Sequence, residues 1–158
     1  MPYHHEWVVA HNGILMVMSE ATIKTFNRYV QDELHKTEAG GILLGMRRGD
    51  HFEIISATEP TKYDIRARTH WQRSRKVHST VAKQAWQQSN GQITYIGEWH
   101  THPENIPSPS FLDINEWHKL SAGCPYRSGY IVVVVGIDAL WCGVAQQKNM
   151  IMPMTKIS

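Results

Sequence analysis

The segment "GYIVVVVG", residues 129–136, constrains the fold of this chain more than its other features. Residues 130–135 are hydrophobic at consecutive positions, so both faces of the strand that they form would be apolar. A strand of this kind needs a packed layer on each side. The next segment, "ALWCGVAQ", is expected to pair with it across a turn at Ile137 and Asp138. The sequence therefore predicts a sheet that is covered by helices.

Further strands and helices are predicted along the rest of the chain. Residues 7–18 are typical of a hairpin, because Asn12-Gly13 between two apolar stretches favours a tight turn. Residues 41–47 and 51–58 are predicted to be strands that pair antiparallel through a turn at Arg47-Arg48-Gly49-Asp50. Residues 92–100 are predicted to be a strand in which Tyr95 and Glu98 point to opposite faces, and the predicted helices are residues 20–34, 77–88 and 110–123. The expected fold class is α/β (α+β), with one mixed sheet flanked by helices in a single domain of residues 1–158.

The first predicted helix has a clear apolar stripe. Ile23, Phe26, Val30 and Leu34 follow one another at helical spacing, and Ser19 before them is a favourable N-cap. The stripe is expected to pack on the sheet.

Residues 58–75 differ from their surroundings. They combine many charges with a few aromatic residues and show neither helical nor strand periodicity. We expect an insertion loop here. Long loops in compact domains often carry function, so residues 63–75 are a candidate for substrate contact, although a solvated loop is an equally good interpretation.

The amino-acid composition gives little information about which partners this chain binds. The chain has 158 residues and a formal net charge of +2, which gives no reason to expect nucleic acid or an anionic membrane as a partner. Its longest apolar run is far shorter than the roughly 20 residues of a membrane-spanning helix. The N-terminus has no secretion-signal pattern, and Cys124 and Cys142 have no metal or redox spacing. We expect a cytoplasmic protein with reduced thiols.

The segment "GEWHTHPENIPSPSFLDINEW" contains a pattern of metal ligands. His100 and His102 are two residues apart, so in an extended strand both imidazoles point to the same side and can share one ion. Asp113 is available as a third ligand. Two histidines and a carboxylate with an open fourth position are a common catalytic zinc site. A simpler interpretation is that Ser110 and Asp113 form a capping pair at the start of a helix.

These residues resemble the JAMM (JAB1/MPN/Mov34) metalloproteases, whose signature is His-x-His, seven residues, Ser, two residues, Asp. The signature is complete in "HTHPENIPSPSFLD", and Glu38 in "TEAGGILLG" matches the context of the family's upstream glutamate. The chain is most similar to small bacterial deconjugases encoded in cyclic-oligonucleotide-based antiphage signalling (CBASS) operons. The resemblance implies an MPN/JAB (cytidine-deaminase-like) fold.

The resemblance also implies a chemistry. Zn²⁺ held by His100, His102 and Asp113 would activate a water molecule. Glu38 would act as general base and pass the proton to the departing amine. The Ser110 hydroxyl would stabilise the negative charge that develops on the carbonyl oxygen, without acting as a nucleophile.

The implied substrate is the C-terminal tail of a ubiquitin-like or sulfur-carrier-like protein, joined through an isopeptide bond to a lysine of a target. A nucleotidyltransferase of the same operon is one candidate partner. Two alternatives remain open: a peptidase that trims the precursor of such a protein, and a noncatalytic MPN scaffold. The complete set of motif residues argues against the scaffold.

Other residues near the motif are expected to be structural. The remaining histidines lack a companion at ligand spacing, and His118 is turned away from Asp113 on the predicted helix. Trp99 and Trp117 are expected in the core. Strand alternation places Glu98 on the same face as His100, where a structural role is favoured over support of the ligands.

Overall fold

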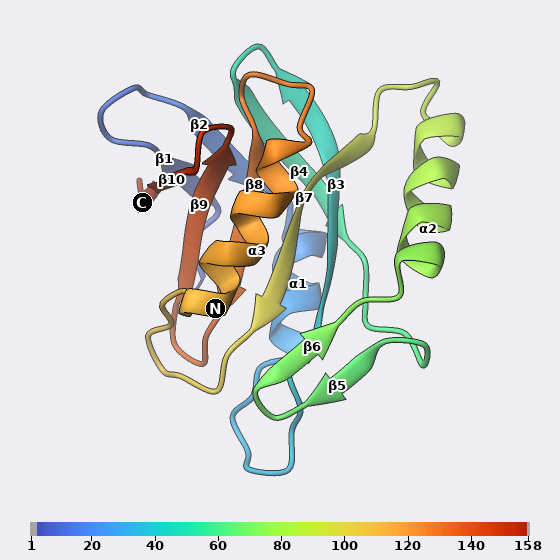
Figure 1. The fold of residues 1–158 in the computed structure, drawn as a ribbon, viewed down its shortest axis with the longest axis vertical. Helices are drawn as coiled ribbons and strands as arrows, with labels where there is room; N and C mark the ends of the chain where they lie inside the picture. Colours follow the sequence, from blue (N-terminus) through green and yellow to red (C-terminus); the bar gives the residue numbers. More distant parts are fainter. Residues whose placement is uncertain (1–2, 158) are drawn as a thin grey trace.

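Strand β8 (Tyr130–Val135) lies inside a nine-stranded sheet in the computed structural model, which describes residues 3–157. Its side chains enter two hydrophobic cores in alternation. The larger core takes Ile131, Val133 and Val135, and the smaller core takes Val132 and Val134. Helix α1 (Glu20–Arg28) packs on the larger core and helix α3 (Phe111–Ala122) on the smaller, so the two helices cover opposite faces (Figure 1). The apolar run thus has a packed layer on each side, as predicted.

The remaining strands complete a mixed sheet. They are β1 (Glu6–Val8), β2 (Leu15–Met18), β3 (Gly40–Arg48), β4 (His51–Ala57), β7 (Thr94–Thr101), β9 (Leu140–Gln146), β10 (Met150–Pro153) and β11 (Thr155–Lys156). Their order is β10-β9-β8-β7-β3-β4-β2-β1-β11. Strands β10 and β11 are consecutive in the chain but pair with opposite ends of the sheet, so residues 150–156 connect its two edges. The predicted α+β class is confirmed.

Both predicted hairpins in the N-terminal half are present. Strands β1 and β2 pair antiparallel, and the turn between them uses Gly13 at φ +74°. Strands β3 and β4 also pair antiparallel, through a turn with Gly49 at φ +62°. Glycine reaches this left-handed region without the steric cost that a Cβ would impose, which explains both turns.

The first predicted helix is shorter than its apolar stripe indicates. Helix α1 ends at Arg28, so the prediction of a helix to Leu34 was wrong. Tertiary contacts at Gln31 override the local pattern, because its Oε1 accepts a hydrogen bond from the Thr101 hydroxyl at 2.7 Å. Leu34 is consequently left 85% exposed.

The segment of residues 58–75 contains regular structure that its composition did not indicate. Strands β5 (Ile65–Ala67) and β6 (His70–Gln72) form a separate two-stranded antiparallel sheet. Helix α2 (Arg75–Gln88) follows and lies beside β7 and β3 (Figure 1). All of β5 is exposed, which explains why no alternation of apolar and polar residues marks it in the sequence.

Strand β7 contains a register shift that changes the side of the sheet to which its side chains point. The register against β3 shifts next to Ile96, whose side chain enters the larger core. Tyr95 and Glu98 therefore share a face, on which both contact Arg73, so the simple alternation predicted for them was wrong. Beyond the shift, Glu98 and His100 line the same groove, as expected.

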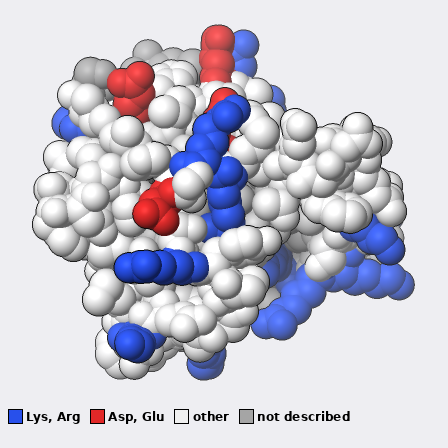
Figure 2. All heavy atoms as spheres, turned by 90° about the horizontal axis from the view of Figure 1, so that it is seen from above, with Lys and Arg blue, Asp and Glu red and all other residues white. Residues whose placement is uncertain are grey.

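The surface carries charges of both signs. On the face shown in Figure 2, basic and acidic side chains lie close together near the centre, and large uncharged areas flank them. Within residues 3–157, no helix is long and apolar enough to cross a membrane. The expectation of no nucleic-acid partner stays a prediction.

Candidate metal centre and active site

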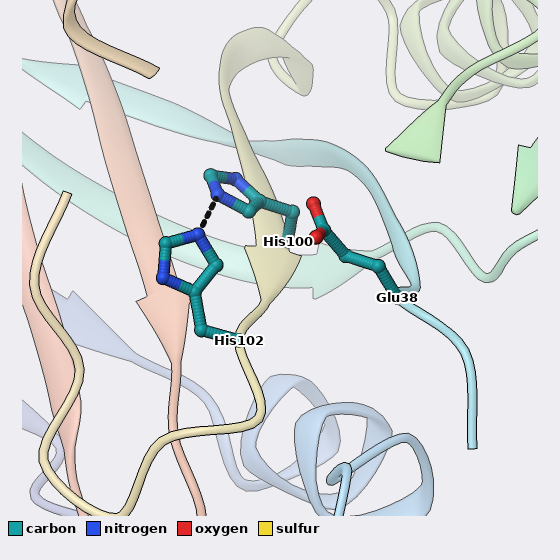
Figure 3. A group of neighbouring side chains, drawn as sticks. All are labelled: Glu38, His100 and His102. Carbon is teal, nitrogen blue, oxygen red and sulfur yellow. Dashed lines mark hydrogen bonds between the residues drawn. The ribbon is translucent and has the colours of Figure 1, made fainter. Parts of the chain in front are cut away.

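His100 and His102 project from the end of β7 toward a common point. His100 belongs to the strand and His102 follows it directly, with its backbone N–H donating to Val135 O of β8 at 3.0 Å. The two ring centroids are 4.9 Å apart and the two Nε2 atoms 3.1 Å apart (Figure 3). Both imidazoles face the same side, as the spacing of two residues predicts.

Asp113 brings both of its carboxylate oxygens to the same point. Its Oδ1 lies 3.1 Å from His100 Nε2, and its Oδ2 lies 3.1 Å from His102 Nε2. The side chain comes from the first turn of α3, which approaches the end of β7 across the loop of residues 102–110. The structure thus brings together the three ligands predicted from the sequence.

The donor set fits a zinc ion. Two ligand nitrogens about 2.0–2.1 Å from a tetrahedral zinc would lie roughly 3.3 Å from each other, which is close to the 3.1 Å between the Nε2 atoms of His100 and His102. Two imidazoles and one carboxylate leave a coordination position for water or substrate. The arrangement is therefore suited to a catalytic rather than a closed structural ion.

Glu38 lies beside the two histidines. It immediately precedes Ala39 and strand β3, and its carboxylate points toward His100 (Figure 3). One oxygen of Glu38 and one nitrogen of each histidine lie within 4.8 Å of one another. Only 7% of Glu38 is exposed, and this burial raises the pKa of its carboxyl group to about 7. Such a pKa suits a group that exchanges protons near neutral pH.

The pKa values of Asp113 and His102 are set mainly by their contacts with neighbouring side chains. Burial would raise the pKa of Asp113, but hydrogen bonds from His100 and His102 outweigh it and hold this pKa far below its usual range. Burial would lower the pKa of His102, but contacts with Asp113 and Glu104 outweigh it and raise this pKa to about 9. Asp113 is therefore ionised at neutral pH, as a metal ligand must be.

Ser110 is the N-cap of α3 as well as a residue of the groove. Its Oγ accepts from Asp113 N–H at 3.1 Å, while Asp113 Oδ2 accepts from Ser110 N–H at 2.8 Å. Ser110 and Asp113 therefore form a capping box, as the simpler interpretation predicts. Capping uses Ser110 Oγ only as an acceptor, so its hydroxyl hydrogen stays free to donate to a substrate.

Glu104 is a neighbour of the candidate site to which the sequence prediction assigned no role. Its Oε1 lies 2.7 Å from His102 Nδ1, the ring nitrogen that faces away from Asp113. A carboxylate on this nitrogen fixes the tautomer and orientation of a ligating imidazole. The only sequence signal is the position of a glutamate two residues after His102.

A groove of about 880 Å³ runs over these residues. Residues 69–73 of the β5–β6 hairpin line one side, and Leu112, Glu116 and Leu120 of α3 line the other. Glu98 also lines the groove, where it forms an ion pair with Arg73. Part of the 63–75 segment is thus placed where a bound tail would lie, and its contact with substrate stays a prediction.

The aromatic residues around the motif are buried. Trp99 is 0% exposed and Trp117 is 2% exposed, as expected for core positions. The Trp117 ring also lies 6.2 Å from that of His100 and forms part of the groove. His118, on the same helix, is not among the residues that line it.

Sequence comparisons agree with this geometry. A family model described as prokaryotic homologs of the JAB domain matches residues 21–148. The chain belongs to this family. A relative from Pseudomonas aeruginosa, named CD-NTase/cGAS isopeptidase, is 40% identical over 141 residues, which is 89% of each chain. A relative of the same name from Escherichia coli is 41% identical over 129 residues, covering 82% of this chain and 80% of that one.

A third relative and a solved structure extend the comparison. The Vibrio cholerae CD-NTase/cGAS isopeptidase is 33% identical over 111 residues, which is 70% of this chain and 69% of the relative. The solution structure of a Desulfitobacterium hafniense protein has a TM-score of 0.66 at 16% identity and covers 90% of this chain and 91% of that chain. This likeness concerns the fold alone. The resemblance to JAB-type deconjugases and the MPN/JAB fold are confirmed.

Proposed function

We propose that this JAB-family protein is a zinc-dependent isopeptidase that cleaves after the C-terminal glycine of a conjugated protein and releases a target lysine. The observation that carries the proposal is the convergence of His100, His102 and Asp113 beside Glu38 in one groove. Relatives named CD-NTase/cGAS isopeptidase support the same reaction class.

His100, His102 and Asp113 would hold the metal. A zinc ion there would act as a Lewis acid and lower the pKa of water from about 15.7 toward 7. Glu104 would keep the His102 ring in the ligating orientation through its contact with Nδ1. The side chains of His100, His102, Asp113 and Glu104 already have this arrangement in the structure. The free energy needed to assemble the site is therefore small.

Glu38 would move the proton. Its carboxylate takes one proton from the attacking water and delivers it to the lysine nitrogen as the amide C–N bond breaks, so the amine leaves neutral. The second water proton stays on the new glycine carboxyl group and passes to solvent when that group ionises. The buried Glu38 carboxylate lies beside His100 and His102, where it is placed to accept this proton. Ser110 would donate its hydroxyl hydrogen to the carbonyl oxygen as negative charge develops there.

The names of the relatives point to a nucleotidyltransferase as the conjugated protein or as part of the conjugate. We place the reaction in CBASS antiphage signalling in the cytoplasm, with a tail of ubiquitin-like type in the groove. Trimming of a ubiquitin-like or sulfur-carrier precursor would use the same residues, so substrate comparison has to separate the two.

The direct test uses two substrates with the same C-terminal tail. One is a nucleotidyltransferase conjugate in which the tail is joined to a lysine side chain, and the other carries a linear extension after the same tail. We expect wild-type protein to cleave the lysine-linked substrate faster, a chelator to stop the reaction, and added zinc to restore it. Glu38→Gln should be inactive, whereas Glu33→Gln, an exposed carboxylate in the same connection between α1 and β3, should retain activity.

Faster cleavage of the linear substrate would show a processing peptidase instead. Absence of cleavage of both substrates by zinc-loaded protein would favour the scaffold.

A further inference from the structure

Both backbone groups of Glu38 are held by the β5–β6 hairpin. Glu38 N–H donates to Ala67 O at 2.6 Å, and Arg66 Nε donates to Glu38 O at 3.0 Å. Both partners belong to the end of β5. The position of the Glu38 carboxylate therefore depends on where the hairpin lies.

The hairpin cannot hold this position by its own packing. Its strand β5 is exposed along its whole length, and β6 has one half-buried residue between two exposed ones. An isolated two-stranded hairpin is at best marginally stable in water. Contacts elsewhere must fix it against the sheet.

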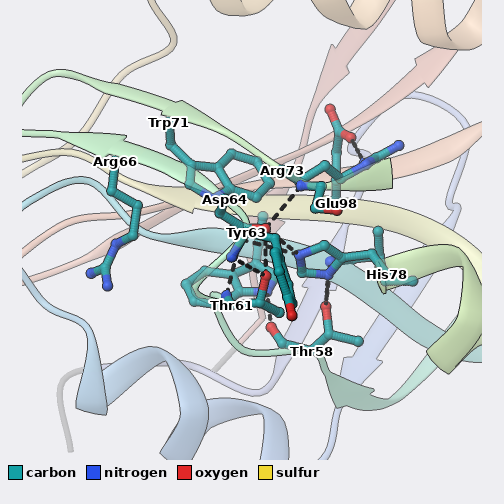
Figure 4. Close-up of polar contacts among 12 residues, drawn as sticks. Thr58, Thr61, Tyr63, Asp64, Arg66, Trp71, Arg73, His78 and Glu98 are labelled. Atoms are coloured by element: carbon teal, nitrogen blue, oxygen red, sulfur yellow. Dashed lines mark hydrogen bonds and ion pairs between the residues drawn. The ribbon is translucent and has the colours of Figure 1, made fainter. Parts of the chain in front are cut away.

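Gln31 and Arg68 hold the turn of the hairpin, and Asp64, directly before β5, holds its open end. The Asp64 side chain is 0% exposed and accepts hydrogen bonds from groups before and after the hairpin (Figure 4). Thr61 donates its N–H and its hydroxyl, at 3.2 and 2.9 Å, and Ser74 donates its N–H at 2.8 Å. Trp71 Nε1 donates at 3.2 Å. One carboxylate thus closes the segment that carries β5 and β6.

His78 of α2 connects Asp64 to the main sheet. Its Nε2 lies 3.2 Å from both oxygens of Asp64, and its Nδ1 lies 2.8 Å from Thr58 Oγ1 (Figure 4). Thr58 Oγ1 also accepts from Ile42 N–H of β3 at 2.9 Å. Because a carboxylate only accepts, His78 Nε2–H donates to Asp64. Asp64, His78 and Thr58 thus link the hairpin to β3.

Trp71 transmits the same constraint to the start of β3. Its ring packs on Gly40, where an added Cβ would lie 2.8 Å from Trp71 Cε3. Gly40 pairs with His100 in the sheet and follows Glu38 by two residues. The Asp64 contacts therefore reach Glu38 by two routes, through β5 and through the Trp71 ring.

The order Asp64, His78, Thr58 resembles a hydrolytic triad, but its surroundings exclude that role. The Thr58 oxygen accepts from the backbone of β3, and an added Cβ on Gly41 would lie only 2.5 Å from it. His78 is 1% exposed. A substrate carbonyl has no room beside this hydroxyl, so the three residues form a structural support.

We propose that Asp64 is a positioning residue, which fixes the β5–β6 hairpin and through it the backbone of Glu38. This inference rests on the proposed isopeptidase function. Asp64 and Thr58 do not line the groove, so they would act on Glu38 and not on substrate.

The test compares Asp64→Asn with Asp50→Asn, an exposed position in the β3–β4 turn. Asparagine has nearly the same shape as aspartate. It has only one acceptor oxygen, whereas the donors around Asp64 share two. We expect kcat to fall about tenfold or more, because a misplaced base slows the chemical step, and KM to change less than kcat although the hairpin lines the groove. Zinc content should stay at the wild-type level, and Asp50→Asn should change none of these quantities.

A second pair of variants tests the proposal if Asp64→Asn does not fold. Thr58→Val removes the hydroxyl that orients His78, whereas Thr58→Ser retains it. We expect Thr58→Val to lower kcat and Thr58→Ser to keep kcat near the wild-type value. An increase in KM with unchanged kcat would overturn the proposal, because it would mean that the hairpin acts on substrate binding alone.

Amide hydrogen exchange measured by NMR gives a readout that needs no activity. In Asp64→Asn and Thr58→Val, protection of the Glu38 amide should fall about tenfold, because its partner is Ala67 O in the loosened hairpin. Wild-type protection of that amide in either folded variant would overturn the proposal. If wild-type protein cleaves no conjugate, the proposed function fails while this measurement still decides the role of Asp64.

Discussion

Replacement of Glu38 by glutamine should make the metal-free protein more stable while removing its activity. Burial raises the pKa of Glu38 from 4.5 to about 7, so the fold favours the protonated carboxyl. One pKa unit corresponds to 1.36 kcal/mol. A raised pKa means that stability is highest below pH 4.5 and falls as pH rises through 7. The wild type should lose about 3 kcal/mol by pH 8, and under about 1 kcal/mol by pH 5.

Glutamine keeps the shape of Glu38 but cannot ionise, so it escapes this loss. The free energy of unfolding, measured by urea denaturation in the presence of a chelator, should be about 3 kcal/mol higher for Glu38→Gln than for wild type at pH 8, and less than about 1 kcal/mol higher at pH 5. The Glu33→Gln control should differ from wild type by less than about 0.5 kcal/mol at both values. The same stability for wild type and Glu38→Gln at pH 8 would refute the reasoning. The chelator matters because a nearby cation would reverse the effect of burial.

Further substitutions test the packing and the site. Gly97→Ala places a Cβ 1.9 Å from a carbonyl oxygen of β8 and should lower the free energy of unfolding by about 3 kcal/mol or more. Gly123→Ala, whose added Cβ has its nearest contact at 3.9 Å, should change it little, and thermal denaturation compares the two. Ser110→Ala should cost about 1 kcal/mol of stability and about 100-fold in kcat, while Ser110→Asn keeps a cap and should lose only the activity. Glu104→Ala frees His102 Nδ1 and should weaken zinc binding about tenfold, measured by competition with a chromogenic chelator; unchanged affinity would remove Glu104 from the site.

The sequence predicts best where one local pattern has one physical solution. Residues 130–135 are apolar at every position, and only a strand with a core on each face buries them all. His100 and His102 were predicted to face the same side because the period of a strand is fixed at two. Asp113 and Glu38 required more, since nothing local indicates that α3 and the start of β3 meet at the end of β7. Asp113 was a candidate from its residue type and its place after the histidines, and the family resemblance assigned its role together with that of Glu38.

The sequence predicts worst where distant hydrogen bonds decide the local structure. The helix of residues 20–34 ends early because Gln31 is bound by Thr101, a residue far along the chain. The hairpin in residues 58–75 has no buried face to mark it, since hydrogen bonds rather than apolar packing hold it. The shift beside Ile96 is likewise invisible without the partner strand. Contacts of this kind leave no periodic signal in the sequence.

Metal content measured by elemental analysis tests the proposed chemistry most directly. Wild-type protein purified with zinc supplied at neutral pH should contain about one zinc ion per chain, since three ligands converge within 3.1 Å of each other. His102→Ala should lose it, and His35→Ala, at an exposed position, should keep it. Absence of zinc from folded wild-type protein, or the same zinc content in wild type and His102→Ala, would contradict the proposed centre.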